Sequence, residues 1–122
     1  MKYLLCFGNP YLKGDSLGAL LAKSLKVNGW ETVECRSPEE LLEYNEEEFV
    51  ILDAALGIEE PILLEDPEAL RERGVVSLHD FDLNFFLKLQ KGLGRRIRVI
   101  AIPADWREEK ARKAVEGMLK KI

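Results

Sequence analysis

Three side chains that can bind a transition metal stand out in this sequence. They are Asp15, Asp53 and His79, and His79 is the only histidine in the chain. Two carboxylates and one imidazole suit a divalent transition metal and leave coordination positions for water or a substrate. A site without thiolate ligands binds its metal weakly. It therefore suits an ion that arrives already bound to a partner better than one that is held permanently.

Each of these residues also has a simpler interpretation. Aspartate is a preferred N-cap residue, so Asp15 could only cap the helix that follows it. Asp53 comes directly after a buried strand and could be a solvated turn residue, and a lone histidine such as His79 is commonly packed or capping. Their common position favours a site, because we expect each of them at a junction between a strand and a helix.

Two other kinds of site fit the sequence poorly. The glycine-rich loop over residues 8–18 matches neither the GxGxxG spacing nor the P-loop, and Asp15 would repel a phosphate. A serine nucleophile has no GxSxG elbow. Cys6 and Cys35 have no CxxC spacing, which excludes a structural zinc knuckle, and Cys6 is expected within a strand, where it is poorly placed to act with His79.

The hydrophobic pattern predicts alternating strands and helices along the chain. Predicted strands cover residues 1–7, 31–35, 49–52 and 97–102, with an edge strand over 61–64 and an extended segment over 75–78. Helices are predicted from Leu17 to a stop at Asn28-Gly29, after a capping box that begins at Ser37, from His79-Asp80 through Leu89, and after a cap formed by Asp105 with Glu108.

This alternation predicts one α/β domain over residues 1–122, with a mostly parallel sheet between helices. Right-handed crossovers place the carboxyl ends of parallel strands at one edge, where open α/β proteins build their sites. The net charge of −4 argues against a nucleic-acid partner, and no apolar run is long enough for a membrane span. The short apolar start breaks at Gly8-Asn9-Pro10, unlike a signal peptide, so we expect a cytoplasmic protein.

Three segments resemble those of the hydrogenase maturation proteases. Gly8-Asn9-Pro10 followed by Asp15 and Gly18 is similar to the N-terminal Gly-Asn…Asp-Asp-Gly-x-Gly signature of that family. The segment from Val50 to Ala54 resembles the strand that carries the family's second acidic ligand. The Ser77-Leu78-His79 segment resembles the part of the family that carries its histidine ligand.

The resemblance implies a fold, an activity and a set of site residues. The implied fold is a three-layer one, in which a twisted five-stranded sheet with one antiparallel edge strand lies between helices. The implied activity is an endopeptidase that removes the C-terminal extension from the large-subunit precursor of a nickel–iron hydrogenase. Asp15, Asp53 and His79 would bind nickel, which the substrate supplies, and would carry the catalysis. We expect the chain to act as a monomer on that precursor.

The chain also departs from the family pattern. Gly14 stands where the first of two adjacent acids is usual, and Glu34-Cys35-Arg36-Ser37 replaces a Asp-Gly-Gly-Thr loop. The segment between Ile102-Pro103 and the last helix is short as well. The shortened segment favours an alternative function, a non-catalytic relative that binds a hydrogenase-like partner or a metal. A small regulatory α/β module is a third interpretation, which rests on the fold alone.

Overall fold

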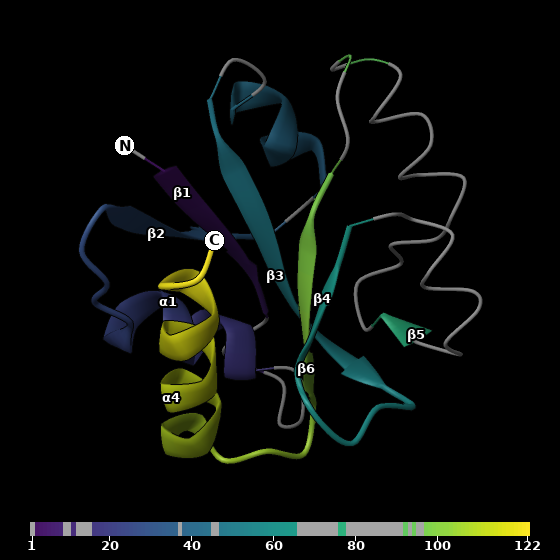
Figure 1. Cartoon of the computed structure of the whole chain (residues 1–122). Coiled ribbons are helices and arrows are strands. Elements are labelled where there is room, and N and C mark those ends of the chain that lie inside the picture. Colours follow the sequence, from purple (N-terminus) through teal and green to yellow (C-terminus); the bar gives the residue numbers. More distant parts are fainter. Residues whose placement is uncertain are drawn as a thin grey trace.

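The chain forms a mixed sheet with helices packed on it (Figure 1). The computed structural model describes residues 2–8, 11, 16–36, 38–44, 47–65, 76–77, 92, 94 and 97–122. Asp15 and His79 lie outside these residues, as does the whole of the helix predicted over 79–89. None of the described helices is long and apolar enough to cross a membrane.

Four strands of the sheet are parallel to one another and lie side by side, as the sequence predicts. They are β1 (Lys2–Phe7), β2 (Trp30–Cys35), β3 (Phe49–Leu56) and β6 (Val99–Pro103). The strand β1 pairs in parallel with β2 on one side and with β3 on the other, and β3 pairs in parallel with β6. Long apolar runs in β1, β3 and β6 are typical of strands that are buried on both faces.

A short antiparallel strand completes the five-strand order β2-β1-β3-β6-β4. This strand, β4 (Ile62–Leu64), pairs antiparallel with β6 and follows Pro61. The prediction of one antiparallel edge strand over residues 61–64 is therefore confirmed. A further strand of two residues, β5 (Val76–Ser77), pairs antiparallel with the end of β3 and lies within the segment predicted to be extended.

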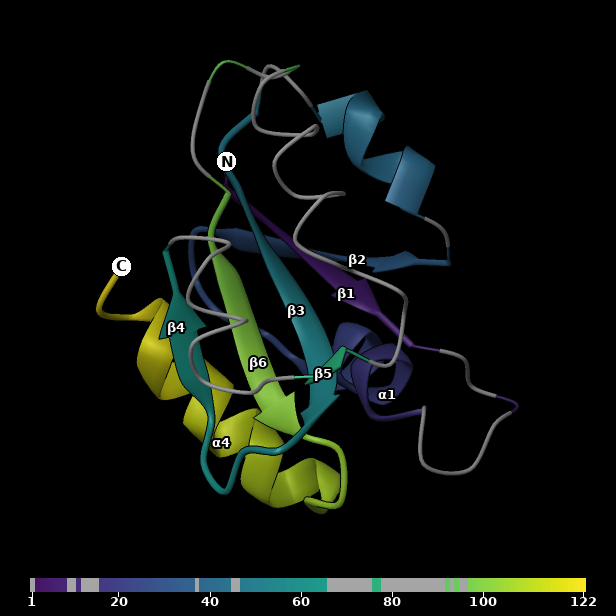
Figure 2. The same ribbon diagram turned by 90° about the vertical axis from the view of Figure 1, so that its right-hand side faces the viewer.

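The two faces of the sheet bury separate apolar clusters. Helices α1 (Leu17–Ser24) and α4 (Glu108–Leu119) pack on one face through residues such as Leu21 and Val115. The 3-10 helix η1 (Pro38–Tyr44) packs on the other face through Leu41, which is fully buried. Figure 2 shows η1 on the opposite side of the sheet from α1 and α4. The described part of the chain therefore has the predicted three-layer α/β arrangement.

Several predicted helix boundaries are wrong by a few residues. Helix α1 ends at Ser24 because Leu25 is extended (φ −70°, ψ 129°), whereas the predicted stop was Asn28-Gly29. The N-cap of α1 is Ser16, so Asp15 is not its N-cap. Helix α4 begins after Arg107 without a side-chain cap, so the predicted capping box from Asp105 does not form. In both helices the apolar spacing located the packed face correctly but not the terminal residue.

Gly18 marks the closest approach between a helix and the sheet. A Cβ atom at this position would lie 1.9 Å from the carbonyl oxygen of Phe7 and 2.7 Å from its carbonyl carbon. Any side chain would therefore overlap the last residue of β1. Glycine at this position lets the first turn of α1 rest directly on the backbone where β1 ends.

We expect Gly18→Ala to lower the free energy of unfolding by about 1–3 kcal/mol, because the backbone of α1 or β1 must move to admit the methyl group. Gly117→Ala is the matched control, since Gly117 is an exposed helix residue with nothing within 4 Å of a Cβ atom. That control should raise the free energy of unfolding by about 0.5–1 kcal/mol. Urea unfolding followed by circular dichroism measures both, and equal effects of the two substitutions would contradict the close approach.

Candidate active site

Asp53 provides a carboxylate on β3, which is the central strand in the five-strand order. It is 3% exposed, and it is the one polar or charged side chain that is buried among the described residues. The prediction that its strand ends at residue 52 is wrong, since β3 continues to Leu56 and Asp53 pairs with Ala101 of β6. Asp53 also does not lie at a strand-to-helix junction, because β3 is followed by the edge strand β4.

The register of β3 places the side chain of Asp53 on one particular face. Side chains alternate along a strand, and Ile51 and Ala55 belong to the apolar cluster on the face that η1 covers. Leu52 and Ala54 belong to the cluster on the face that α1 and α4 cover. Asp53 therefore shares the η1 face. A buried carboxylate needs polar partners, and among the described residues Asp53 is the one side chain of this face that could provide oxygen ligands from a buried position.

Asp53 also lies where the pairing between β1 and β3 stops. Cys6 of β1 pairs with Leu52, and Asp53 is the next residue of β3. Beyond Phe7 the chain leaves the sheet at Gly8, which is buried. The buried carboxylate therefore lies beside the start of the first loop, at the carboxyl edge of the parallel strands.

Both ends of the first loop are held at this edge. The loop leaves β1 at Gly8, and it returns through Ser16 to α1, where Gly18 rests on the carbonyl group of Phe7. Asp15 itself lies outside the described residues, three positions before Gly18. The backbone on either side of Asp15 therefore starts and finishes next to the strand end that precedes Asp53.

The second predicted ligand segment is also tied to β3. Ser77 pairs with Ala55, and Val76 pairs with Leu56, in the antiparallel ladder between β5 and β3. His79 lies outside the described residues, two positions after Ser77, and Asp53 lies two positions before Ala55. The pairing thus places the segment just before His79 alongside the strand that carries Asp53.

Of the three predicted site residues, the structure describes only Asp53. No group of three or more potential metal ligands occurs among the residues that it describes. A carboxylate such as that of Asp53 can bind a metal ion through its oxygens but needs further ligands to hold it. Whether Asp15 and His79 meet at this carboxylate stays a prediction, which is supported by the anchored segments on both sides of Asp15 and by the pairing of β5 just before His79.

An aromatic and a cationic residue that were not predicted as site residues lie at the same edge. Tyr11, in the first loop, is 83% exposed. The guanidinium carbon of Arg36 lies 5.7 Å from the centroid of the Tyr11 ring. Arg36 directly follows β2, and its guanidinium group lies 3.5 Å from a carboxylate oxygen of Glu34. The available signal was the position of both residues in loops that follow predicted parallel strands.

The two cysteines are poorly suited to nucleophilic catalysis. Cys6 and Cys35 are buried free thiols that belong to the clusters on opposite faces of the sheet. Burial raises the pKa of the Cys6 thiol far above its ordinary value. Burial, with a smaller contribution from the carboxylates of Glu40, Glu43 and Glu34, raises the pKa of Cys35 to about 12. Both thiols therefore stay protonated near neutral pH, where only a thiolate would be nucleophilic.

Solved structures of known proteins share this arrangement. The [NiFe] hydrogenase maturation protease HybD from Thermococcus kodakarensis superimposes with a TM-score of 0.68 at 23% identity, over 98% of this chain and 97% of that one. The endopeptidase HycI from Escherichia coli gives a TM-score of 0.69 at 22% identity, over 99% and 90% of the two chains. The hydrogenase maturating endopeptidase HybD from E. coli gives 0.67 at 14% identity, over 98% and 92%.

The chain has the fold of the hydrogenase maturation proteases. No family model matches it, and no curated protein matches its sequence, so the likeness is one of structure. The maturation-protease fold accounts for nearly all of the chain, and the short connection between β6 and α4 does not remove any large part of it.

We expect neither thiol of the folded protein to react with iodoacetamide at about pH 8, whereas both should react in denaturant. Because the thiol pKa values are higher in the folded state, the unfolded state loses more protons as the pH rises above the ordinary thiol value of 9.0. The free energy of unfolding should therefore fall between pH 9 and about 12 through these groups. Rapid labelling of Cys6 in the folded protein would contradict this assignment.

Proposed function

We propose that this protein is an endopeptidase that removes the C-terminal extension of a nickel–iron hydrogenase large-subunit precursor after nickel has been inserted. The observation that carries the proposal is the buried Asp53 in the maturation-protease fold, at the strand that holds the segments next to Asp15 and His79. The sequence resemblance places the family's three metal ligands at these same residues. The structural likeness supports the fold, and the sequence resemblance supports the choice of residues within it.

The proposed roles follow from the chemistry of the side chains. Asp15 and Asp53 would provide carboxylate oxygens, and His79 would provide a neutral imidazole nitrogen, to a nickel ion that belongs to the substrate. These ligands would hold the precursor with its scissile peptide bond at the carboxyl edge of the sheet. The substrate's nickel can orient the precursor, polarise the scissile carbonyl group or activate a water molecule, and each of these roles needs the same three ligands.

Weak binding of free metal would be part of this function. With only carboxylate and imidazole ligands, the site would favour nickel that the precursor already holds over nickel from solution. A precursor without nickel would then lack the contact that positions it. In this way the protease would act only after the metal has been loaded.

The deciding experiment incubates the purified protein with nickel-loaded and nickel-free large-subunit precursor and detects loss of the C-terminal peptide by mass spectrometry. We expect cleavage of the loaded precursor only. Asp53→Asn, Asp15→Asn and His79→Ala should each lower the cleavage rate by at least about 100-fold, since each removes a proposed ligand and even outer residues of metal sites can cost 10–100-fold.

Asp105→Asn is the matched control, because Asp105 is an exposed aspartate in the connection between β6 and α4. It should cleave at the wild-type rate. The circular dichroism spectrum and melting temperature of every variant show whether it is folded. Undiminished cleavage by Asp53→Asn and His79→Ala would reject the proposed site.

A second candidate function is a non-catalytic relative that binds the precursor without cutting it. The observation that favours it is the short connection of residues 104–107 between β6 and α4, together with Arg36 in place of the usual loop after the second strand. Binding of the nickel-loaded precursor without release of any peptide by the wild-type protein would support this function and reject the first.

A further inference from the structure

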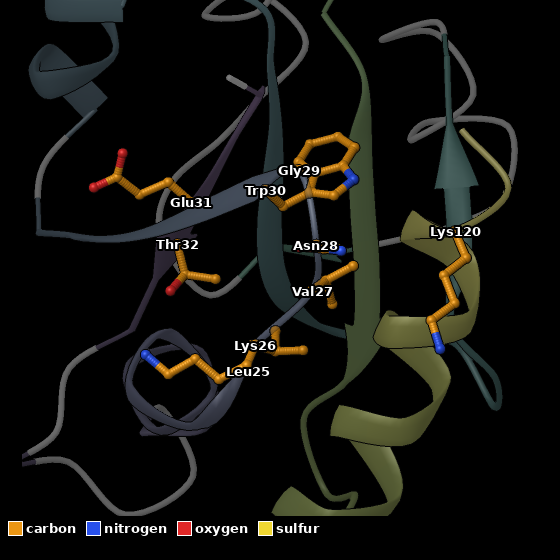
Figure 3. A pocket seen from close by; sticks show the side chains of 9 residues that line it. All are labelled: Leu25, Lys26, Val27, Asn28, Gly29, Trp30, Glu31, Thr32 and Lys120. Atoms are coloured by element: carbon orange, nitrogen blue, oxygen red, sulfur yellow. The ribbon is translucent and has the colours of Figure 1, made fainter.

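A hollow opens at the other end of the sheet from the candidate active site. It has a volume of about 930 Å³ and is bordered by the turn that joins α1 to β2, by the start of β2 and by the end of α4 (Figure 3). Its lining residues are Leu25, Lys26, Val27, Asn28, Gly29, Trp30, Glu31, Thr32 and Lys120. Trp30 pairs with Lys2 at the start of β1, whereas Asp53 follows the last residue pair of β1 and β3.

Apolar side chains form one part of this hollow. Leu25 and Trp30 are buried members of the cluster under α1 and α4, and Val27 packs partly against them. The backbone at Gly29 adopts a left-handed conformation (φ 87°), and no atom lies within 4 Å of where its Cβ would be. The turn therefore leaves the partly exposed Val27 and the remaining exposed edge of Trp30 accessible to a partner's apolar side chain.

Two ammonium groups, those of Lys26 and Lys120, and one carboxylate, that of Glu31, line the hollow. Neither Lys26 nor Lys120 forms an ion pair with any residue that the structure describes. A third ammonium group, that of Lys2, lies 4.7 Å from the centre of the Trp30 ring and donates a hydrogen bond of 3.2 Å to the carbonyl oxygen of Ile122. These groups gather at one edge of a chain whose net charge is −4.

The two unpaired lysines do not converge on one point. Figure 3 shows Lys26 and Lys120 on opposite sides of the row formed by Val27 and Trp30, with the carboxylate of Glu31 on the same side as Lys26. A small compact anion would reach only one ammonium group. An extended segment with an acidic residue at Lys120 and an apolar residue against Val27 and Trp30 would use both features. The carboxylate of Glu31 makes the Lys26 side less attractive to an anion, so Lys120 is the principal contact.

We propose that this hollow docks an acidic, partly apolar segment of a partner protein. The segment's carboxylate pairs with Lys120, and its neighbouring apolar side chain packs against Val27 and the edge of Trp30. Because this edge is opposite the one that carries Asp53, docking leaves the candidate active site accessible. The proposal does not depend on the proposed protease activity, since it rests on a different part of the molecule.

Two tryptophans make the docking measurable. Trp30 lines the hollow, and Trp106 lies in the connection between β6 and α4, where the ammonium group of Lys110 covers its ring at 4.0 Å. The probe is a short blocked peptide of alternating leucine and glutamate, and its matched control replaces each glutamate by glutamine. We expect the acidic peptide to shift the indole N–H signal of Trp30 in nitrogen-15 NMR spectra while that of Trp106 stays in place.

Substitutions then identify the charged contact. Lys120→Ala should weaken peptide binding about threefold and Lys26→Ala less than twofold, as expected for exposed charge pairs of unequal geometry. Added salt should weaken binding by the wild-type protein. Lys113→Ala is the matched control on α4, because Lys113 already pairs with Glu109 at 3.5 Å, and it should bind the peptide as the wild type does.

Several results would overturn the proposal. Equal binding of the glutamine peptide would show that charge plays no part, and undiminished binding by the double variant of Lys26 and Lys120 would place the contact elsewhere. An equal shift of the Trp30 signal by inorganic phosphate at the same concentration would show that an anion alone is sufficient. A shift of Trp106 in place of Trp30 would move the docking to the opposite edge.

Discussion

The direct contact between Gly18 and the carbonyl group of Phe7 is the constraint on which the site end of the molecule depends. It sets the height of α1 above the sheet, since a side chain at this position would push the helix away. It also fixes where the first loop returns, because α1 begins at Leu17, only one residue earlier. The loop that contains Asp15 is therefore closed at both ends on the strand end that adjoins Asp53. A glycine without any chemistry of its own thus fixes the C-terminal end of this loop at the edge of the sheet.

Asp53 illustrates how a site can be held inside a strand instead of on a loop. Its neighbours on both sides are buried and apolar, and β6 pairs with it along one edge. Such surroundings restrict the carboxylate to one face of the sheet and limit the positions that its oxygens can take. A ligand that is positioned by the regular backbone of β3 can be aligned more accurately than one that depends on a flexible connection. The cost is a buried carboxylate in an otherwise apolar strand.

The sequence predicted the layers of the fold better than the ends of its elements. Apolar runs identify β1, β3 and β6 because these strands are buried on both faces, and Pro61 marked the edge strand. The length of β3 was missed because small residues after Asp53 carry little strand signal, although they pair with β6 and β5. Asp53 itself was found by its type in an apolar run. The docking hollow was not predicted, because it is formed by segments that are far apart in the chain and become neighbours only through packing.

The two outermost described strands, β2 and β4, are also poorly suited to pair with a strand of a second copy of the chain. The strand β4 has only three residues and follows Pro61, which cannot donate a backbone hydrogen bond. The strand β2 carries Glu31 and Glu34, so a second β2 laid against it would bring like charges together. A sheet with such outer strands can leave its carboxyl edge open and still avoid edge-to-edge pairing with copies of itself.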